Sequence, residues 1–259
     1  MIELKGESLK NAAELFASCS DSMVWSCLEG CMGHIWADRA EHPRSAQAVL
    51  ADFCFFAGQP DESLVRHRPP SANPDFLIMV PADEEWAKMI ESIYGSRAAR
   101  VTRYAIKKEK DVFNAEKLRA AVENAEEHFQ ICLFDEAMYH AAQQNEWSRD
   151  FCSQFPDYAA YRLHGLGVGV LYHRELVSGA SSYTWYHGGI EIEIDTRHDF
   201  RRRGLAFACG ARLILECQKR GLYPSWDAQN KNSVTLAEKL GYHFEKEYPA
   251  YEITGISTK

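Results

Sequence analysis

Apolar residues near the start of the chain follow two different spacings. Over residues 1–45 they return at about every third or fourth position, which predicts helices that pack by one face. Residues 48–58 form a run rich in aromatic side chains that a glycine ends, and this run predicts one strand. A polar stretch with three prolines follows at residues 66–74 and predicts a loop.

Strand and helix patterns then alternate up to residue 122. Residues 76–80 form a short apolar strand that a proline stops, and Asp83 is placed to cap the helix that follows. Residues 99–106 alternate as a strand does, and Asn114 is placed to cap a second helix. This order is typical of an α/β unit.

The second half of the chain predicts an antiparallel meander followed by two helices. Two short turn sequences, at residues 174–175 and 187–189, separate three closely spaced strands. The longer helix carries one apolar stripe that includes Leu205 and Cys209. The predicted elements are strand 129–134, helices 136–145 and 155–163, strands 167–172, 178–186 and 189–195, helix 205–220, strand 222–227, helix 233–240, and one or two strands within 242–253.

A charged segment at residues 123–128 lies between these two patterns and is predicted to be a turn. We therefore predict two domains. Residues 1–125 form an N-terminal α/β domain, and residues 126–259 form a mixed α+β domain that contains the meander.

The composition is that of an ordinary globular protein. Of 259 residues, 46% are hydrophobic and 25% are charged, and no apolar run approaches the ~20 residues of a membrane span. The N-terminus has no pattern of a secretory signal, so we expect a cytoplasmic protein without membrane contact. A net charge of -8 argues against nucleic acid as the partner and favours a small molecule. A homodimer is left open.

The eight cysteines are scattered, and several lie in apolar stretches, so we interpret them as reduced thiols. Cys27, Cys31 and His34 form the tightest cluster of metal-ligand residue types. A structural zinc site uses four ligands, and no second pair accompanies these three. Core packing is the simpler interpretation, and no metal is expected.

The segment that indicates chemistry is a strand, a basic turn and a helix. Residues 189–195 read Gly-Ile-Glu-Ile-Glu-Ile-Asp, and residues 201–206 read Arg-Arg-Arg-Gly-Leu-Ala at the predicted start of the long helix. A helix N-terminus binds phosphate, and Gly204 allows the backbone to approach the ligand. Ala206 leaves the first turn uncrowded, while the arginines supply positive charge. Taken alone, such a run is more often a solvated turn.

Two landmarks give this region a resemblance to the GNAT superfamily of N-acetyltransferases. The family signature Gln/Arg-x-x-Gly-x-Gly/Ala is matched by Arg201, Gly204 and Ala206. Downstream, Asn230, a helix and a Leu-Gly-Tyr ending at Tyr242 resemble the second landmark. The resemblance covers about residues 129–253. The amino-acid sequence of this region is most similar to that of the zwittermicin A resistance acetyltransferases, in which a divergent N-terminal half precedes the catalytic domain.

The resemblance implies a GNAT fold, with a central mixed, mostly antiparallel sheet flanked by helices, and acetyl-CoA as cosubstrate. The strand before the signature would splay from its neighbour and bind the pantetheine arm through its backbone. The signature amides would hold the pyrophosphate, and Asn230 would help to fix the cofactor or would serve as an ordinary helix cap. The implied cofactor-binding residues are Ile194, Asp195, Thr196, Arg201, Arg202, Arg203, Gly204, Leu205, Ala206 and Asn230.

The implied reaction is direct attack by a primary amine of a small molecule, and it needs a base. Glu191 and Glu193 are the candidates, with Glu193 preferred. Strand alternation puts both on one face and the isoleucines between them on the other, so the carboxylates could also simply face solvent.

The general acid is not where the family usually has it, because Ala237 occupies the position of the usual tyrosine. Tyr242, Tyr248 or Tyr251 could protonate the departing thiolate, and of these Tyr248 is chosen. Alternatively the thiolate leaves unassisted, since a thiol pKa of about 8.5 makes it a tolerable leaving group. Cys209 is a poor nucleophile candidate because it lies on an apolar helix stripe.

Two other functions remain open from the sequence. The missing tyrosine and the large N-terminal half would also suit a catalytically silent acyl-CoA-binding module that regulates a partner. A nucleotide-binding enzyme is less favoured, since the chain has neither a Gly-x-Gly-x-x-Gly motif nor a Gly-Lys-Ser/Thr loop. The N-terminal half could be a degenerate second copy of the same fold. The sequence does not identify the acceptor of the acetyl group, although the excess of acidic residues favours a cationic amine.

Overall fold

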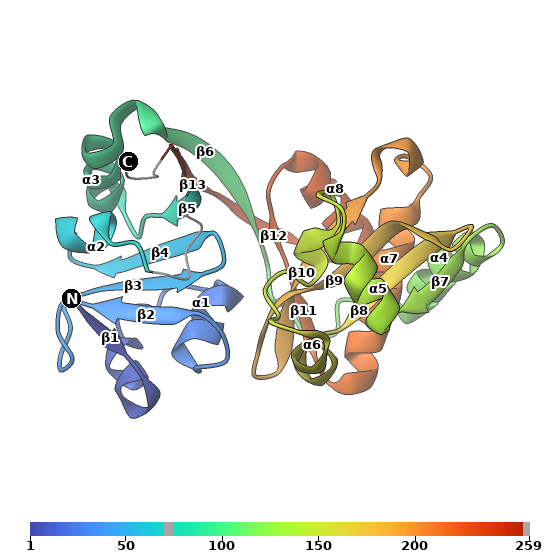
Figure 1. Cartoon of the computed structure of the whole chain (residues 1–259), viewed down its shortest axis with the longest axis horizontal. Helices are drawn as coiled ribbons and strands as arrows, with labels where there is room; N and C mark the ends of the chain where they lie inside the picture. Colours follow the sequence, from blue (N-terminus) through green and yellow to red (C-terminus); the bar gives the residue numbers. More distant parts are fainter. Residues whose placement is uncertain (70–74, 256–259) are drawn as a thin grey trace. The chain divides into compact units, whose positions relative to one another are not determined.

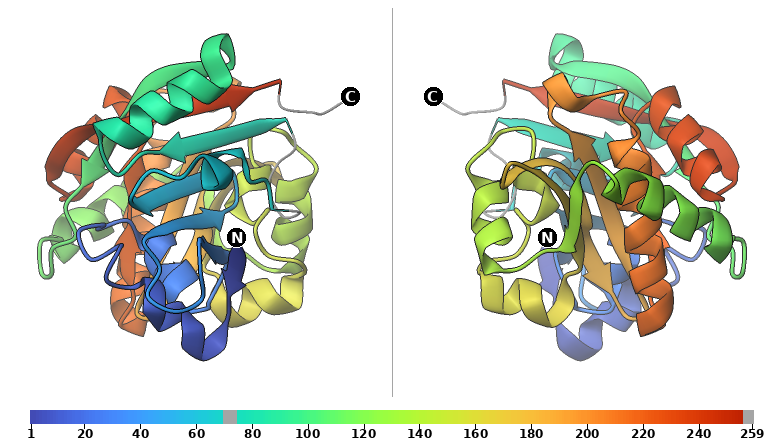
Figure 2. Two further views of the ribbon diagram at one scale, coloured as in Figure 1. Left: turned by 90° about the vertical axis from the view of Figure 1, so that its left-hand side faces the viewer. Right: turned by 90° about the vertical axis from the view of Figure 1, so that its right-hand side faces the viewer.

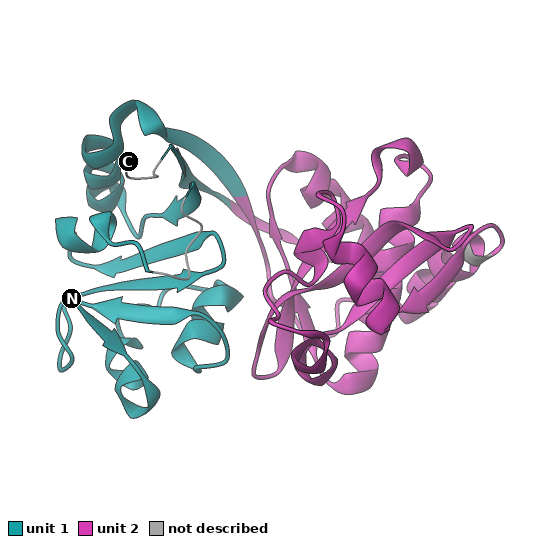
Figure 3. Ribbon diagram, viewed as in Figure 1, with its two compact units in different colours: residues 1–103, 247–259 teal, residues 104–246 magenta. Residues whose placement is uncertain are grey.

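Two β-sheets organise residues 1–69 and 75–255, the part of the chain that the computed structural model describes (Figure 1). The chain forms two compact units: unit 1, residues 1–103 and 247–259, and unit 2, residues 104–246 (Figure 3). The chain passes between the units within two long strands, β6 (Ala98–Ile106) and β13 (Phe244–Thr254). The domain boundary expected between residues 125 and 126 stays a prediction.

Unit 1 is built on a sheet in the order β1-β2-β3-β4-β5-β13-β6. The end of β6 that lies in unit 2 pairs with β12. The pairs β1–β2, β2–β3, β3–β4 and β5–β13 are antiparallel, whereas β4 and β5 are parallel. Trp86, fully buried on a helix of this unit, stacks on Phe56 and anchors its core. The elements are β1 (Ile2–Leu4), η1 (Gly6–Ala12), α1 (Ser22–Leu28), β2 (His34–Ala37), β3 (Ser45–Leu50), β4 (Phe53–Gly58), α2 (Glu62–Arg66), β5 (Phe76–Val80), α3 (Glu84–Tyr94) and η2 (Gly95–Arg97).

The prediction of helices throughout residues 1–45 was wrong at both ends. Ile2–Leu4 and His34–Ala37 are strands that pair antiparallel with one another, and only Ser22–Leu28 is an α-helix. Pairing between segments some thirty residues apart overrides a local spacing that is compatible with either structure.

The predicted single strand at residues 48–58 is a hairpin of β3 and β4. Both strands are buried on both faces, so neither shows the polar alternation that would separate them, and Asp52 at the turn is the one charged residue within the run. The chain turns at Ala51, whose φ of 55° is left-handed although alanine gives no sequence signal for it. Of the loop predicted at residues 66–74, Arg66 ends α2 and residues 70–74 lie outside the described residues.

Unit 2 contains a five-stranded sheet in the order β11-β10-β9-β8-β7, and every pair is antiparallel except β10 and β11. The predicted mixed, mostly antiparallel sheet flanked by helices is therefore confirmed. The elements are α4 (Ala115–Glu126), β7 (Gln130–Leu133), α5 (Glu136–Gln143), η3 (Arg149–Phe151), α6 (Tyr158–His164), β8 (Gly167–Tyr172), β9 (Glu175–Tyr186), β10 (Gly189–Thr196), η4 (His198–Phe200), α7 (Leu205–Arg220), β11 (Tyr223–Ser225), β12 (Asp227–Ala228) and α8 (Lys231–Leu240).

The helix predicted over residues 205–220 and the strand predicted over residues 167–172 have the predicted bounds. The structure of the charged segment 123–128 differs from its prediction. It was predicted as a turn, but α4 continues through Glu126. Charged side chains on the solvent side of a helix do not end it unless a glycine, a proline or a cap residue is present.

Helices cover the two faces of this sheet differently. α4 and α7 lie side by side on one face, while α5, η3 and α6 cover the other (Figure 2). The first face is aliphatic: Ile190 and Ile192 of β10 are buried in the same core as Leu213 of α7. The second face is aromatic, with Phe151 and Tyr161 packed on it.

The feature that positions the candidate site is the separation of β10 from β11. The two strands pair in parallel only from Gly189↔Tyr223 to Glu191↔Ser225. Beyond Ser225 the chain turns away, and Asp227 pairs with β6 instead. The rest of β10 is therefore left with an open edge on that side.

Within residues 1–69 and 75–255, no helix has both the length and the apolar character that crossing a membrane demands.

A buried hydroxyl pair on the aromatic face gives the first prediction. Tyr161 Oη and Ser181 Oγ are 2.6 Å apart and both residues are buried. Ser181→Ala leaves the phenol without this partner, so we expect the free energy of unfolding to fall by about 1–3 kcal/mol. Adding Tyr161→Phe removes the second polar group and should recover part of that loss, as measured by urea unfolding followed by circular dichroism. Equal stability of the single and double variants would contradict this account.

Candidate active site

The N-terminus of α7 differs from those of the other α-helices in the described residues. Each of α1 to α6 and α8 has an Asp or Asn at its N-cap whose side chain accepts a backbone N–H, whereas α7 begins at Gly204 without such a cap. The first amide bonded within the helix is that of Ala208, which donates to Gly204 O at 3.1 Å. The amides of residues 204–207 are thus the unpaired donors of this terminus, and they suit an anion.

Gly204 has the geometry that such an approach needs. Its φ of 79° is left-handed, and a Cβ added there would meet no atom within 4 Å. Space is therefore open in front of the amides. Leu205 itself is buried in the core and Ala206 is half-buried, so both can serve a ligand through their backbone N–H groups.

The three arginines before Gly204 have different surroundings. Arg201 donates from Nε to Thr196 O at 3.0 Å and pairs with Asp195 Oδ1 at 3.3 Å, which ties the turn to the end of β10. Arg203 donates to Asp199 O at 3.2 Å, and its guanidinium lies over a phenylalanine ring. Arg202 is exposed and has a left-handed φ of 63°. All three contribute positive charge beside the amides of α7.

Backbone groups of β10 face the edge that β11 has left. Arg197 N–H donates to Val177 O at 2.9 Å, which fixes the phase of the ladder with β9. Alternate residues of an antiparallel strand point their N–H and C=O to opposite sides, so those of Ile192 and Ile194 point away from β9. Ile192 adjoins the last pair with β11, Glu191↔Ser225, so Ile194 is the residue whose N–H and C=O face the open edge and can bind an extended ligand.

The other predicted residues of this stretch have structural contacts. Asp195 Oδ1 accepts the N–H of Thr196 at 2.6 Å, and Thr196 Oγ1 lies 2.7 Å from Ser178 Oγ. Asn230 caps α8, where its Oδ1 accepts the N–H of Ser233 at 3.0 Å. Asn230 therefore acts as a helix cap in this structure, as one of its two sequence interpretations expected.

Glu191 and Glu193 lie on the face of β10 opposite the isoleucines, as alternation predicted. Ile194 Cδ1 would lie 3.2 Å from a Cβ added to Gly210 of α7, so the isoleucine side faces that helix. Glu191 is only 5% exposed, so it does not simply face solvent. Its Oε1 accepts the N–H of Asp227 at 2.7 Å, which bridges the point where β11 leaves β10. Glu193 is partly exposed.

Sequence reasoning missed three hydroxyl residues beside Glu191. Thr184 and Ser225 are the direct neighbours of Glu191 on β9 and β11, and Tyr186 Oη lies 2.9 Å from Ser225 Oγ. All three are buried. The alternation of residues 182–186 held a signal for Thr184 and Tyr186 sharing a face, but the register that puts them beside Glu191 is a tertiary property.

Comparison with known proteins identifies the family. A family model described as GNAT acetyltransferase matches residues 13–251, which is most of the chain. The chain belongs to the GNAT acetyltransferase family. Members of this family are enzymes that use acetyl-CoA, and an uncapped helix terminus beside a splayed strand fits that ligand.

Individual GNAT relatives agree with this assignment. The chain is 37% identical over 89 residues to the uncharacterized N-acetyltransferase YdfB of Bacillus subtilis (strain 168), a match that spans 34% of either protein. It resembles the crystal structure of a GCN5-related N-acetyltransferase-like protein from Streptococcus suis 89/1591 with a TM-score of 0.89 and 42% identity, covering 95% of this chain and 98% of the other. A tandem GNAT protein from the clavulanic acid biosynthesis pathway shares the fold, with a TM-score of 0.55, 10% identity and coverage of 96% and 95%.

The tyrosines considered as general acid in this GNAT protein lie in unlike places. Ala237 is buried in the core, so the usual position offers no acid. Tyr242 is buried and donates to Pro224 O at 2.7 Å, and burial raises the pKa of its phenol. Tyr251 donates to Glu91 Oε1, and burial is the main cause that raises its pKa to about 12. Tyr248 is partly buried and belongs to unit 1, whereas both glutamates belong to unit 2.

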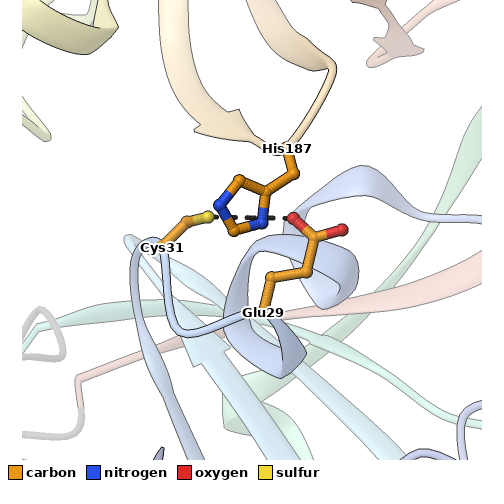
Figure 4. A group of neighbouring side chains, drawn as sticks. All are labelled: Glu29, Cys31 and His187. Atoms are coloured by element: carbon orange, nitrogen blue, oxygen red, sulfur yellow. Dashed lines mark hydrogen bonds between the residues drawn. The ribbon is translucent and has the colours of Figure 1, made fainter.

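Cys27, Cys31 and His34, for which the sequence favoured core packing over a metal site, have separate surroundings. Cys27 is buried and donates to Val49 O, with a thiol pKa raised by burial, and His34 Nδ1 lies 2.7 Å from Glu3 Oε1. Cys31 Sγ lies 3.7 Å from Glu29 Oε2 on the turn after α1 (Figure 4). His187, which the figure also draws, belongs to unit 2. The expected absence of a metal stays a prediction.

Cys209 has the properties of an inert core thiol. It is fully buried, and burial raises its pKa to about 12. The buried thiol is therefore largely un-ionised at pH 8 and shielded from reagents, so iodoacetamide should modify the partly exposed Cys19, Cys31 and Cys132 well before Cys209. Peptide mass spectrometry of the folded protein measures the order. Equally fast labelling of Cys209 would show that its burial is not maintained in solution and would reopen a covalent mechanism.

Proposed function

We propose that this GNAT protein transfers an acetyl group from acetyl-CoA to a primary amine of a small molecule by direct attack. The observation that supports this most is the uncapped N-terminus of α7 next to the open edge of β10. The cosubstrate supplies a thioester whose carbonyl carbon an amine can attack. Family membership supports the acetyl transfer, and the residues below support its details.

In this proposal the phosphates and the pantetheine arm use backbone groups. The amides of residues 204–207 hold the pyrophosphate, and the charges of Arg201, Arg202 and Arg203 reinforce them. The open edge of β10 at Ile194 binds the amides of the pantetheine arm, with Asp195 and Thr196 shaping its outer end. Asn230 contributes through the position of α8 rather than through a free side chain.

Glu193 is proposed as the base and Glu191 as a fixed negative charge. Glu193 is partly exposed, so it can pass a proton on to solvent, whereas Glu191 is bonded to the backbone at Asp227. The acceptor nitrogen loses two protons in all. Glu193 takes the first, directly or through water, before attack, and the second ends on the sulfur as the C–S bond breaks and the C–N bond forms.

Departure of the thiolate needs no acid from α8. Ala237 supplies none, and a thiol with a pKa of about 8.5 is a tolerable leaving group. Tyr248 stays the proposed alternative donor. Cys209 lies buried in the core with a raised pKa, which supports direct transfer without an acyl-enzyme.

The absence of a general acid at Ala237 favours a second candidate function. In this alternative the protein is a catalytically silent acyl-CoA-binding module that regulates a partner. Such a protein would bind acetyl-CoA through α7 and β10 but would not turn it over. Binding and turnover therefore have to be measured separately.

The N-terminal half, residues 1–125, is proposed to be a degenerate second copy of the GNAT fold. Its strand and helix order supports this, as does the fold shared with a protein described as a tandem GNAT. The amino-acid sequence of residues 191–206 supports the proposal that the chain belongs near the zwittermicin A resistance branch of the family. We also propose that residues 1–125 form an N-terminal α/β domain and residues 126–259 the acetyltransferase domain.

Binding is tested with a matched pair of glycine variants. Gly204→Glu puts a carboxylate in front of the α7 amides, and we expect acetyl-CoA to bind about 30-fold more weakly, which is about 2 kcal/mol. Gly221→Glu is the control, since Gly221 at the other end of α7 also has a left-handed φ, of 68°, and open space at its Cβ. Its dissociation constant should match that of the wild type in calorimetric titration. Equal weakening in both variants would indicate helix damage, and no binding by the wild type would refute the proposed site.

Catalysis is tested at Glu193. Glu193→Gln removes the base but not the hydrogen-bonding shape, so kcat should fall about 10²- to 10⁴-fold and the acidic limb of the pH–rate profile should disappear. Acetyl-CoA affinity should not change. Glu245→Gln, at an exposed position on β13, is the control. Unchanged turnover in Glu193→Gln would transfer the role of base to Glu191 or to another group.

A further inference from the structure

Three side chains form a row across unit 2 at the last residue pair before β11 leaves β10. The register pairs Thr184 of β9 with Glu191 of β10, and Glu191 with Ser225 of β11. Directly opposed residues point to the same face with Cβ atoms about 4.5–5.5 Å apart. The row therefore lines up a hydroxyl, a carboxylate and a second hydroxyl at the start of the open edge of β10.

The members of this row differ in how their polar atoms are satisfied. Ser225 Oγ is bonded to Tyr186 Oη at 2.9 Å, and Glu191 Oε1 accepts the N–H of Asp227. Thr184 is 0% exposed, and its Oγ1 has no hydrogen-bond partner among the described residues. A buried hydroxyl without a partner loses its hydrogen bonds to water and gains none in the protein, so it destabilises the fold. Such groups are rare in proteins, and a bound ligand is one partner that can satisfy them.

The backbone is irregular on both sides of β10 just past this row. The register with β9 shifts between Glu191 and Ile192, so that Tyr183 is an extra residue on β9. On the other side the pairing with β11 ends at Ser225. Bulges of this kind re-aim side chains near active sites. Thr184 is the residue of β9 next to the bulge, and it faces the carboxylate side of β10.

On the basis of the function proposed above, we infer that Thr184 is a substrate-binding residue that holds the acceptor amine. Its Oγ1 accepts a hydrogen bond from the amine, while the Glu191 carboxylate opposite attracts the ammonium form. An ammonium group has three donors, so it satisfies the hydroxyl, Glu191 and the base Glu193 together. Glu193 follows Glu191 on the same face of β10 and takes the proton. The substrate class is a primary amine rather than a hydroxyl or thiol acceptor, because the row sets the Thr184 hydroxyl directly beside the Glu191 carboxylate and both groups can accept hydrogen bonds from an ammonium group.

The test uses an isosteric substitution. Thr184→Val keeps the shape of the side chain and removes only the hydroxyl, and Thr184→Ser keeps the hydroxyl. The controls are the wild type and Thr235→Val, a change at an exposed position on α8. Three quantities are measured in the full chain: acetyl-CoA affinity by calorimetry, acetyl-CoA consumption with putrescine or with water alone as the nucleophile, and the urea midpoint of unfolding.

We expect Thr184→Val to bind acetyl-CoA as the wild type does and to unfold at the same or higher urea concentration. Its kcat/KM for putrescine, or its rate of hydrolysis by water in the amine position, should fall at least tenfold. Thr184→Ser should retain most of the wild-type rate. Loss of turnover without loss of stability is a result that a purely structural threonine would not give.

Two outcomes would overturn the inference, and they differ from one another. If Thr184→Val is stable and its turnover equals that of the wild type, the hydroxyl is only an unsatisfied or water-bonded core group, while the acetyltransferase proposal stands. If the wild type binds acetyl-CoA but consumes none with either nucleophile, the chain is a silent module and the inference fails together with catalysis.

Discussion

The separation of β10 from β11 after Glu191 and Ser225 is the constraint on which the candidate site depends. A continuous parallel pair would bury the backbone groups of Ile194 in the ladder, whereas the early end of β11 leaves them facing an open edge. The Glu191 carboxylate spans the gap to the N–H of Asp227, and Asp227 pairs with β6. The split is therefore held by hydrogen bonds on both sides and is not a frayed strand end.

The start of α7 complements this split. A glycine N-cap with open space leaves the first amides without a side-chain partner, while Arg201 fixes the preceding turn to the end of β10. The strand edge and the helix terminus both offer backbone donors, which are rigid and do not depend on side-chain rotamers. A ligand with an extended polar arm and a diphosphate matches both features at once.

The two faces of β10 differ in charge. Isoleucines of β10 pack on α7 and exclude water behind the open edge, and the two glutamates face the other way among buried hydroxyl residues. Ser225 and Glu191 have partners in the chain, whereas Thr184 Oγ1 has none among the residues that the structure describes. A partly desolvated carboxylate attracts a cation more strongly than one in water, which is consistent with an amine as acceptor.

The sequence by itself determined the local features: the meander, the long helix, its glycine N-cap and the alternation that separates the isoleucines from the glutamates. Each follows from residues close together in the chain, for which periodicity and cap chemistry are reliable. Tertiary structure alone decided that residues 48–58 turn back as a hairpin, that Ile2–Leu4 pairs with His34–Ala37, and that Thr184 and Ser225 flank Glu191. Strand register depends on pairing between distant segments, and strands that are buried on both faces lack the polar alternation that would show where one ends and the next begins.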